Sequence, residues 1–214
     1  MIGTRMTGIT AAGQITANAI RDEAAQLFFL HGFEATSLRQ VATGVGIKVG
    51  SLYNHIENKE DLLLQIMGGT MDELMEIQEK ALAECSDIIE KLIVLLSCHI
   101  RFHAEHAQVV FIGNSELRSL SPENRAQIIA RRREYQTMIQ NLIEEADRSG
   151  RALVLDARLH TFSIVAMGTH VASWYKGSGN LSLDRIINIY SKIALRGLGV
   201  ADADALVDKK FPAL

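Results

Sequence analysis

The stretch TSLRQVATGVGIKVGSLYNHIENKEDLL, residues 36–63, constrains the fold most strongly, because several helix-boundary signals lie close together in it. Ser37 can cap a helix, and Gln40 three residues later completes a capping box. Gly44 and Gly46 tolerate the positive φ of a sharp turn, so we expect the helix to stop there and the chain to reverse. The pattern predicts two helices joined by a tight turn.

A second helix is expected over residues 48–56, with Leu52 and Ile56 pointing inward. It begins with the small residues Gly50 and Ser51 and is rich in hydrogen-bonding side chains. Such a helix can enter a DNA major groove, where its leading residues approach base edges and its flanks reach phosphates. The alternative interpretation is that these are ordinary helices of an all-α core.

The residues around this turn resemble the tetracycline-repressor (TetR) family of bacterial one-component transcription regulators. The similarity covers about residues 14–64 and rests on Phe28, Gly32, Phe33, Thr36, Ser37, Val41, Ala42, Val45, Gly46, Gly50, Ser51, Leu52, Tyr53, His55, Lys59, Glu60, Asp61 and Leu62. It implies an all-α protein with a helix-turn-helix DNA-binding domain over residues 14–60 and an effector-binding and dimerisation domain over residues 61–200. We expect residues 1–13 to form a flexible arm and residues 201–214 a polar tail that can contain one helical turn.

The resemblance also implies which residues contact DNA: Thr36, Ser37, Lys48, Val49, Gly50, Ser51, Tyr53, Asn54, His55 and Lys59. Lys48 and Asn54 have side chains suited to the edges of guanine and adenine. Tyr53, His55 and Lys59 suit phosphates. Val49 stands where many members of the family carry a polar or basic residue, and it is suited to contact a thymine methyl group.

Charge is the feature that fits DNA binding least well. The chain has a net charge of −3, and residues 1–60 contain five basic and five acidic residues. We therefore expect modest non-specific affinity and a shallow dependence of DNA binding on salt. A neutral head also leaves open an alternative function, a helical ligand carrier or interaction module whose head does not bind DNA.

Composition and motifs argue against several other classes. Hydrophobic residues make up 48% of the chain, yet no run of eighteen apolar residues exists, so we expect no transmembrane helix. Residues 1–13 show no secretory signal, and Cys85 and Cys98 are expected to be reduced thiols, so we expect a cytoplasmic protein. We find no Gly-rich phosphate loop, Gly-x-Ser-x-Gly turn, HExxH motif or convincing triad, so we expect no enzymatic activity, no catalytic residue and no cofactor.

Downstream of the turn, the helical spacing of apolar residues predicts an all-helical body. Asn58 is expected to cap a helix reaching residue 84, in which Gly68 and Gly69 form a joint between head and body. Further helices are expected over residues 86–106, 107–119, 122–149, 156–176 and 182–198. The last two have more apolar positions than one chain can bury, so we expect a homodimer in which they form a four-helix bundle.

The effector pocket is expected between residues 85 and 176, lined by His99, Phe102, His103, His106, Phe111, Arg132, Trp174 and Tyr175. The three histidines share one helix face, a spacing that metal ligands also use. No cysteine or carboxylate cluster completes such a site, with Glu105 and Glu116 as the only candidates. We therefore expect pocket or core histidines and no metal.

The body is similar to TetR-family regulators of fatty-acid and steroid catabolism, which sense acyl-CoA thioesters. The similarity rests on His103, His106-Ala107-Gln108-Val109-Val110, Glu116-Leu117, Arg125, Arg132, Trp174-Tyr175-Lys176 and Gly179. It implies an apolar effector, with an acyl-CoA thioester as a candidate whose phosphates meet arginine or lysine side chains. Ser173 stands where some of these regulators carry an arginine. The alternatives are a small hydrophobic or aromatic effector and an arginine-rich helix that is only a solvated face.

Together these expectations describe a homodimeric repressor that binds operator DNA with a palindromic sequence. A small apolar effector would release it by favouring a dimer geometry in which the two recognition helices no longer match the DNA. Activation instead of repression is an alternative that the sequence leaves open.

Overall fold

The computed structural model describes residues 11–211, which form ten α-helices, one short 3₁₀ helix and no strand. The predicted all-α fold is confirmed. Most of the predicted arm lies outside the described residues, and its last residues belong to the first helix. The elements are α1 (Ala11–His31), α2 (Leu38–Val45), α3 (Val49–Leu52), α4 (Lys59–Ala83), α5 (Ile88–Glu105), α6 (Ala107–Ser115), η1 (Leu117–Ser119), α7 (Pro122–Arg148), α8 (Ala157–Trp174), α9 (Leu183–Gly197) and α10 (Ala203–Lys210).

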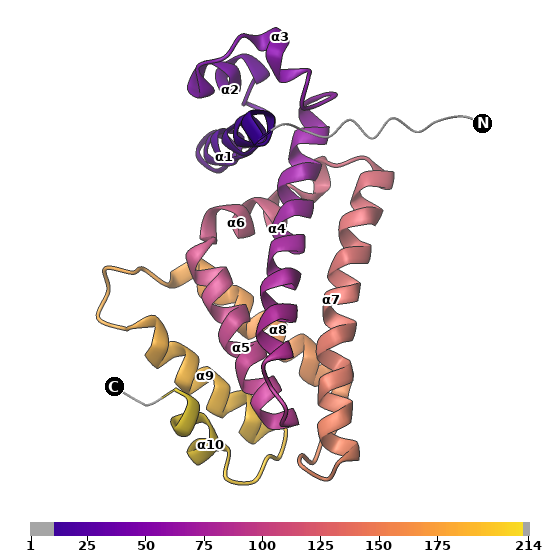
Figure 1. Cartoon of the computed structure of the whole chain (residues 1–214), viewed down its shortest axis with the longest axis vertical. Helices are drawn as coiled ribbons and strands as arrows, with labels where there is room; N and C mark the ends of the chain where they lie inside the picture. The colour runs from indigo at the N-terminus through magenta and orange to yellow at the C-terminus, as the bar shows by residue number, and fades with distance from the viewer. Residues whose placement is uncertain (1–10, 212–214) are drawn as a thin grey trace, which may run out of the picture.

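Helices α1, α2 and α3 form a head at one end of the molecule (Figure 1). The predicted capping box is confirmed: the Ser37 hydroxyl accepts a bond from the Gln40 amide, and the Gln40 side chain accepts one from the Ser37 amide. Gly46 supplies the left-handed turn with φ 77°. Gly44 has a different role from the one predicted, because it lies inside α2, where a Cβ would meet Oε1 of Glu23 at 2.0 Å.

The second helix of the motif is shorter than predicted. It was expected over residues 48–56, but α3 ends at Leu52. The amides of Asn54 and His55 bond to the carbonyls of Ser51 and Leu52, three residues back, so the chain tightens into turns. Leu52 and Ile56 are buried, as predicted.

Helix α4 connects the head to the body and runs without interruption past both glycines (Figure 1). Its predicted cap is confirmed, since the Asn58 side chain accepts a bond from the Asp61 amide. Arg131 of α7 covers Gly68 and donates a bond of 3.0 Å to its carbonyl, whereas a Cβ at Gly69 would meet no described atom within 4 Å. The two glycines therefore differ, and Gly68 is the one that allows a close approach.

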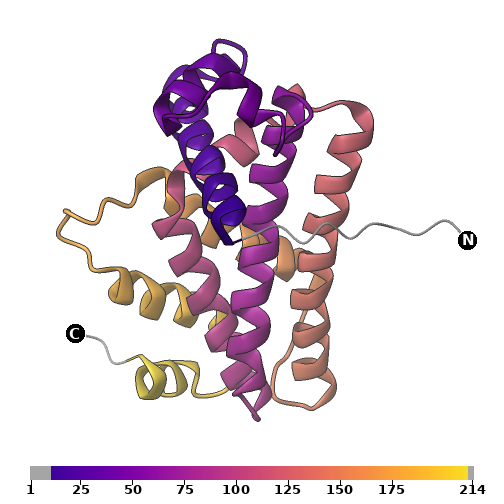
Figure 2. The same cartoon turned by 45° about the horizontal axis from the view of Figure 1, so that its top comes forward.

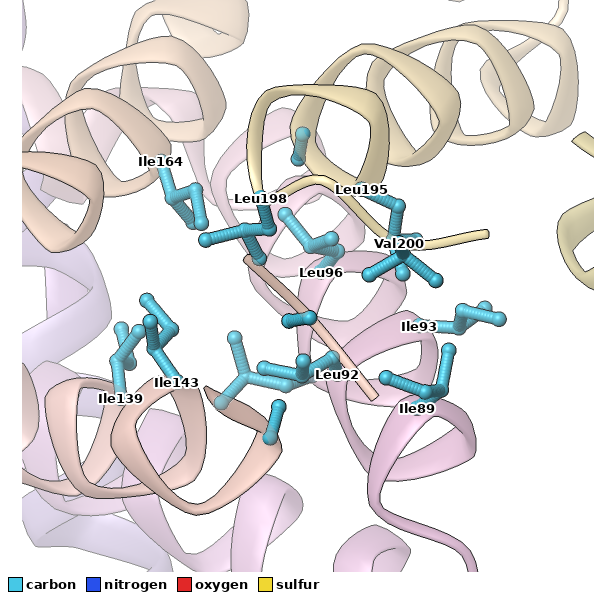
Figure 3. Packing of buried hydrophobic residues seen from close by; sticks show 14 of the residues in the cluster. Ile89, Leu92, Ile93, Leu96, Ile139, Ile143, Ile164, Leu195, Leu198 and Val200 are labelled. Atoms are coloured by element: carbon cyan, nitrogen blue, oxygen red, sulfur yellow. The ribbon is translucent and has the colours of Figure 1, made fainter. Parts of the chain in front are cut away.

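Helix α5 is the centre of the body and packs against α4, α7, α8 and α9. Figure 3 shows its buried residues meeting those of α7, α8 and the end of α9: Ile89, Leu92, Ile93, Leu96, Ile139, Ile143, Ile164, Leu195, Leu198 and Val200. Each buried leucine or isoleucine of this kind stabilises the fold by roughly 1.5–3 kcal/mol. The helix is apolar on nearly all sides, which fits its central position.

The head is packed onto the body (Figure 2). Its hydrophobic core continues into Ile112 of α6, Leu120, and Ile128 of α7. A polar contact reinforces this junction, because the Glu60 carboxylate accepts bonds of 2.7 Å from the Ser121 amide and from the Asn124 side chain. These bonds lower the pKa of Glu60.

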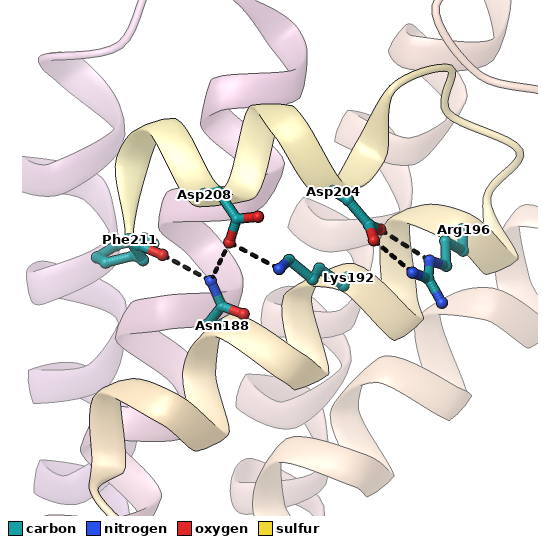
Figure 4. A network of polar contacts seen from close by, with 6 residues as sticks. All are labelled: Asn188, Lys192, Arg196, Asp204, Asp208 and Phe211. Carbon is teal, nitrogen blue, oxygen red and sulfur yellow. Dashed lines mark hydrogen bonds and ion pairs between the residues drawn. The ribbon is translucent and has the colours of Figure 1, made fainter. Parts of the chain in front are cut away.

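The chain beyond residue 200 differs from the predicted polar tail. Residues Ala203–Lys210 form α10, whose Ala203 and Val207 are buried in the body core. Its acidic side chains face α9, where Asp208 accepts from Asn188 at 2.8 Å and pairs with Lys192 (Figure 4). The single helical turn allowed for this segment is thus extended to an eight-residue helix, which Ala203 and Val207 anchor in the body core.

Candidate functional site

The surface around α3 carries most of the residues predicted to contact DNA. Lys48, Gly50 and Asn54 are exposed, and the Tyr53 side chain is 56% exposed. A Cβ at Gly50 would meet no described atom within 4 Å, so the backbone there is open to a close approach by a partner. The remaining members of this surface are Ser37, which is exposed, and Val49, Ser51 and His55, which are half-buried.

Two of the residues predicted to contact DNA, Thr36 and Lys59, form hydrogen bonds within the head. Thr36 is only 2% exposed, and its hydroxyl donates a bond of 2.9 Å to the Gly32 carbonyl. Lys59 donates to the carbonyls of Phe33, Glu34 and Thr36 at 2.9, 3.2 and 3.1 Å, and its ammonium lies 4.4 Å from the centre of the Phe33 ring. An ammonium has three protons to donate, so Lys59 is fully engaged in holding the loop between α1 and α2. Motif position indicated the residue types but not their burial.

A cavity of about 350 Å³ lies in the body, between α4, α5, α6, α7 and α8. Four of the predicted effector residues line it: His99, Phe102, His103 and Arg132. Most of the other lining residues are apolar, and they are accompanied by a few polar ones: Met67, Thr70, Met71, Leu74, Val109, Val110, Gly113, Asn114, Ile128, Tyr135, Gln136, Phe162, Val165, Ala166 and Thr169. This combination is typical of small-molecule sites, although the volume is at the low end of the usual range of roughly 300–1,000 Å³.

A buried chain of hydrogen bonds forms one wall of the cavity. The Gln78 side chain donates to the Tyr135 hydroxyl at 3.1 Å, and that hydroxyl lies 2.7 Å from Nδ1 of His99. On the other side of the ring, Nε2 of His99 lies 3.2 Å from the Val165 carbonyl, which can only accept. The consistent arrangement is that Tyr135 donates to Nδ1 and that His99 donates through Nε2–H. His99 is therefore neutral, and burial holds its pKa well below the usual value.

Gly168 of α8 allows this arrangement. A Cβ at position 168 would lie 2.2 Å from Cδ2 and 2.8 Å from Nε2 of His99, closer than such atoms approach one another. The absence of a side chain at Gly168 thus creates the space that the His99 ring occupies between α5 and α8.

His103 and Arg132 are the other polar groups of interest. Nδ1 of His103 lies 2.8 Å from the His99 carbonyl, and burial lowers the pKa of His103 to about 4. Arg132 is half-buried and donates a bond of 2.7 Å to the Gly113 carbonyl, while burial lowers its pKa. The cavity therefore offers a neutral imidazole and a guanidinium in otherwise apolar surroundings.

The other four predicted effector residues do not line this cavity. His106 stacks on Phe102, with ring centres 4.2 Å apart, and Phe111 packs edge-on against a ring of α1. Trp174 and Tyr175 lie at the end of α8, where Trp174 contacts Tyr190. Across residues 11–211, no group of three or more His, Cys, Asp or Glu side chains is placed to hold a metal ion.

Sequence reasoning missed two members of the hydrogen-bonded wall. Gln78 continues the apolar stripe of α4 at the fourth residue after Leu74, so a polar side chain at a core position was the available signal. Tyr135 is the only aromatic residue of α7 and is completely surrounded. Neither position indicates by itself that the two side chains meet each other and His99.

Helices α8 and α9 also carry exposed apolar side chains. Leu159, Phe162 and Trp174 of α8 are 61%, 41% and 38% exposed, and Ile189 and Ile193 of α9 are 42% and 51% exposed. The two helices contact each other, so these side chains make α8 and α9 a candidate interaction surface. None of the helices within the described part of the chain is long and apolar enough to cross a membrane.

Comparison with known proteins agrees with this architecture. Residues 20–66 match the family described as "Bacterial regulatory proteins, tetR family", and residues 85–198 match "Tetracyclin repressor-like, C-terminal domain". The HTH-type transcriptional repressor KstR2 of Mycolicibacterium smegmatis is 31% identical over 193 residues, which cover 86% of this chain and 93% of KstR2.

Two solved structures are similar over nearly their whole length. A tetR-family regulatory protein from Rhodococcus RHA1 has a TM-score of 0.80 at 27% identity, covering 87% of this chain and 98% of that one. AibR, crystallised with isovaleryl coenzyme A and operator DNA, has a TM-score of 0.73 at 27% identity, covering 93% of this chain and 100% of that one. The family and the curated relative are those of transcription regulators. The resemblance seen in the helix-turn-helix residues is thus confirmed, and the chain belongs to the TetR family of transcription regulators.

Proposed function

We propose that this protein is a cytoplasmic homodimeric repressor that binds a palindromic operator through the surface around α3 and is released by an apolar effector in the body cavity. The proposal rests on two residues that the cavity shares with the hydrophobic core of the head. Met67 and Ile128 line the cavity, and both also belong to the hydrophobic core of the head. A ligand that displaces these side chains therefore acts directly on the packing that orients α3.

An acyl-CoA thioester is the effector that we propose first. The cavity is apolar, with Arg132 on its wall, and the similar protein AibR has been crystallised with isovaleryl coenzyme A. A volume of about 350 Å³ suits a short or branched acyl group better than a long chain. The CoA portion would then remain outside the cavity.

The test measures the affinity of the protein for fluorescent DNA taken from upstream of its own gene. The measurement is made with and without isovaleryl-CoA. We expect operator binding that isovaleryl-CoA abolishes and free CoA does not, with a shallow salt dependence because few free cations surround α3. If the wild type binds no DNA after selection from a random library, the repressor function is wrong. Ligand binding without DNA binding would favour the alternative of a ligand carrier.

The dimer is proposed to form through α8 and α9, which present the exposed apolar side chains described above. Burying them against a second copy as a four-helix bundle would place two α3 surfaces on one DNA duplex. Ile193→Lys should give monomers in sedimentation experiments, because it places a charge in the centre of that interface. Ile129→Lys is the matched control, since Ile129 is a 41% exposed isoleucine on α7, and it should leave the dimer intact.

A further inference from the structure

The proton of the His103 ring has a fixed position. Nδ1 lies 2.8 Å from the His99 carbonyl, which can only accept a hydrogen bond, so Nδ1 carries the proton. The ring is 8% exposed and is neutral because burial opposes its charged form. Nε2 of His103 must then present a lone pair.

This lone pair has no hydrogen-bond donor among the described residues. His103 lines the cavity, and no described residue gives Nε2 a hydrogen bond. The neighbouring groups differ in this respect, because the Tyr135 hydroxyl is engaged by Gln78 and His99, and both nitrogens of His99 have partners. Nε2 of His103 is therefore the acceptor of this aromatic cluster that remains available to a ligand.

A free acceptor in an apolar cavity favours ligands that carry a hydrogen-bond donor. An effector without a donor would bury Nε2 unpaired, and the loss of its hydrogen bond to water would go uncompensated. Sites with such buried polar groups discriminate strongly against analogues that lack the matching group. A ligand with a donor at the right place restores the bond and keeps the apolar contacts.

We propose that the effector presents a hydroxyl group, or another uncharged hydrogen-bond donor, to Nε2 of His103, so that the cavity prefers hydroxylated apolar ligands. The proposal rests on the assignment of this cavity as the effector site, and it narrows the entering group to a hydroxylated one. Isovaleryl-CoA, whose acyl group has no hydroxyl, is then expected to bind more weakly than a hydroxylated analogue.

The test uses two isomers, 1-octanol and methyl heptyl ether, which contain the same atoms but differ in having a donor. Titration calorimetry with the full-length protein should show that the alcohol binds about five- to tenfold more tightly, the ratio expected for one net hydrogen bond. Equal binding, tighter binding of the ether, or binding of neither compound would overturn the proposal. This comparison needs no variant, so it does not depend on how a substitution folds.

Two variants locate the effect. His103→Phe keeps a ring of similar shape and should abolish the preference, so that the alcohol and the ether bind with equal affinity. His106→Phe makes the same substitution three residues later, at the C-terminal cap of α5 and outside the cavity, and it should leave the preference unchanged. If His103→Phe retains the full preference, the assignment to His103 is wrong.

Operator binding separates this inference from the proposed function. Release of DNA by isovaleryl-CoA without any preference for the alcohol would reject the proposed hydrogen bond to His103. The repressor function would not be affected by that result. A clear alcohol preference that His103→Phe removes, in a protein that binds no DNA, would support the proposed hydrogen bond and reject the repressor function.

Discussion

Replacing Gly168 by alanine should destabilise the body, although the same change usually stabilises a helix. In a helix interior alanine is favoured over glycine by about 1 kcal/mol. At position 168, however, the new Cβ would lie 2.2 Å from Cδ2 of His99, which is 1% exposed and packed on all sides. Overpacking of this kind costs about 1–3 kcal/mol.

Moving the His99 ring adds a second cost. Its bonds to Tyr135 at 2.7 Å and to the Val165 carbonyl at 3.2 Å would be strained or broken, and an unpaired buried group costs about 1–3 kcal/mol. After subtraction of the helix-propensity gain, the net loss for Gly168→Ala is about 1–5 kcal/mol. Ligand binding should weaken as well, because His99 lines the cavity.

Urea unfolding followed by circular dichroism measures this loss, with Gly69→Ala as the matched control. Gly69 also lies inside a helix, and a Cβ there would meet no described atom within 4 Å, so Gly69→Ala should raise stability by up to about 1 kcal/mol. If Gly168→Ala is as stable as Gly69→Ala, then the close approach of α8 to His99 does not exist as described.

Three further predictions concern the head, its junction with the body, and pH. Lys59→Met should lower stability by about 1–3 kcal/mol because three loop carbonyls lose their donor, whereas Lys48→Met should weaken operator binding at unchanged stability. Thermal melts measure the first effect and DNA titrations the second, and a Lys59→Met variant of unchanged melting temperature would contradict the structural role of Lys59. Glu60→Gln should lower the urea midpoint by the equivalent of about 0.5–1.5 kcal/mol, and a variant unchanged in stability would show that the Glu60 bonds to α7 contribute nothing. Between about pH 6.5 and pH 4 the unfolded chain binds a proton at His103 that the folded chain does not, so the free energy of unfolding should decrease by up to about 3 kcal/mol as the pH is lowered through this window. Urea midpoints measured at several pH values should decrease less steeply for His103→Phe than for the wild type. Parallel curves would refute the lowered pKa of His103.

The helix boundaries were largely predictable from the sequence, because caps are local. Asn58, Ser121, Asp156 and Ser182 each accept a bond from an amide three residues ahead, which is where residues of these types cap a helix. Gly46 likewise has the positive φ that a turn of this kind requires. Signals of this type depend only on residues within one turn, so a single sequence contains them in full.

The cavity was only partly predictable, because it depends on how helices distant in sequence are set against one another. The pairing of His99 with Tyr135 joins residues 36 apart, and Gly168 matters only through its distance from His99. The burial of single residues could not be predicted either, since Thr36 was expected to contact DNA but is only 2% exposed. The pocket was expected within residues 85–176, whereas α4 also lines the cavity through Met67, Thr70, Met71 and Leu74. The sequence did not indicate the hydrogen bonds of the cavity wall.

The core shared by head and body has a consequence for engineering. A hybrid regulator made by joining the first 66 residues of this chain to another sensor would lose the surface formed by Ile112, Leu120 and Ile128, on which the head rests. The transplanted head would be left with apolar side chains facing water, and Glu60 would lose its two donors, the Ser121 amide and the Asn124 side chain. The unit that can be exchanged between regulators is therefore discontinuous in sequence, and a working chimera should carry α6, η1 and the first turns of α7 along with the DNA-reading helices.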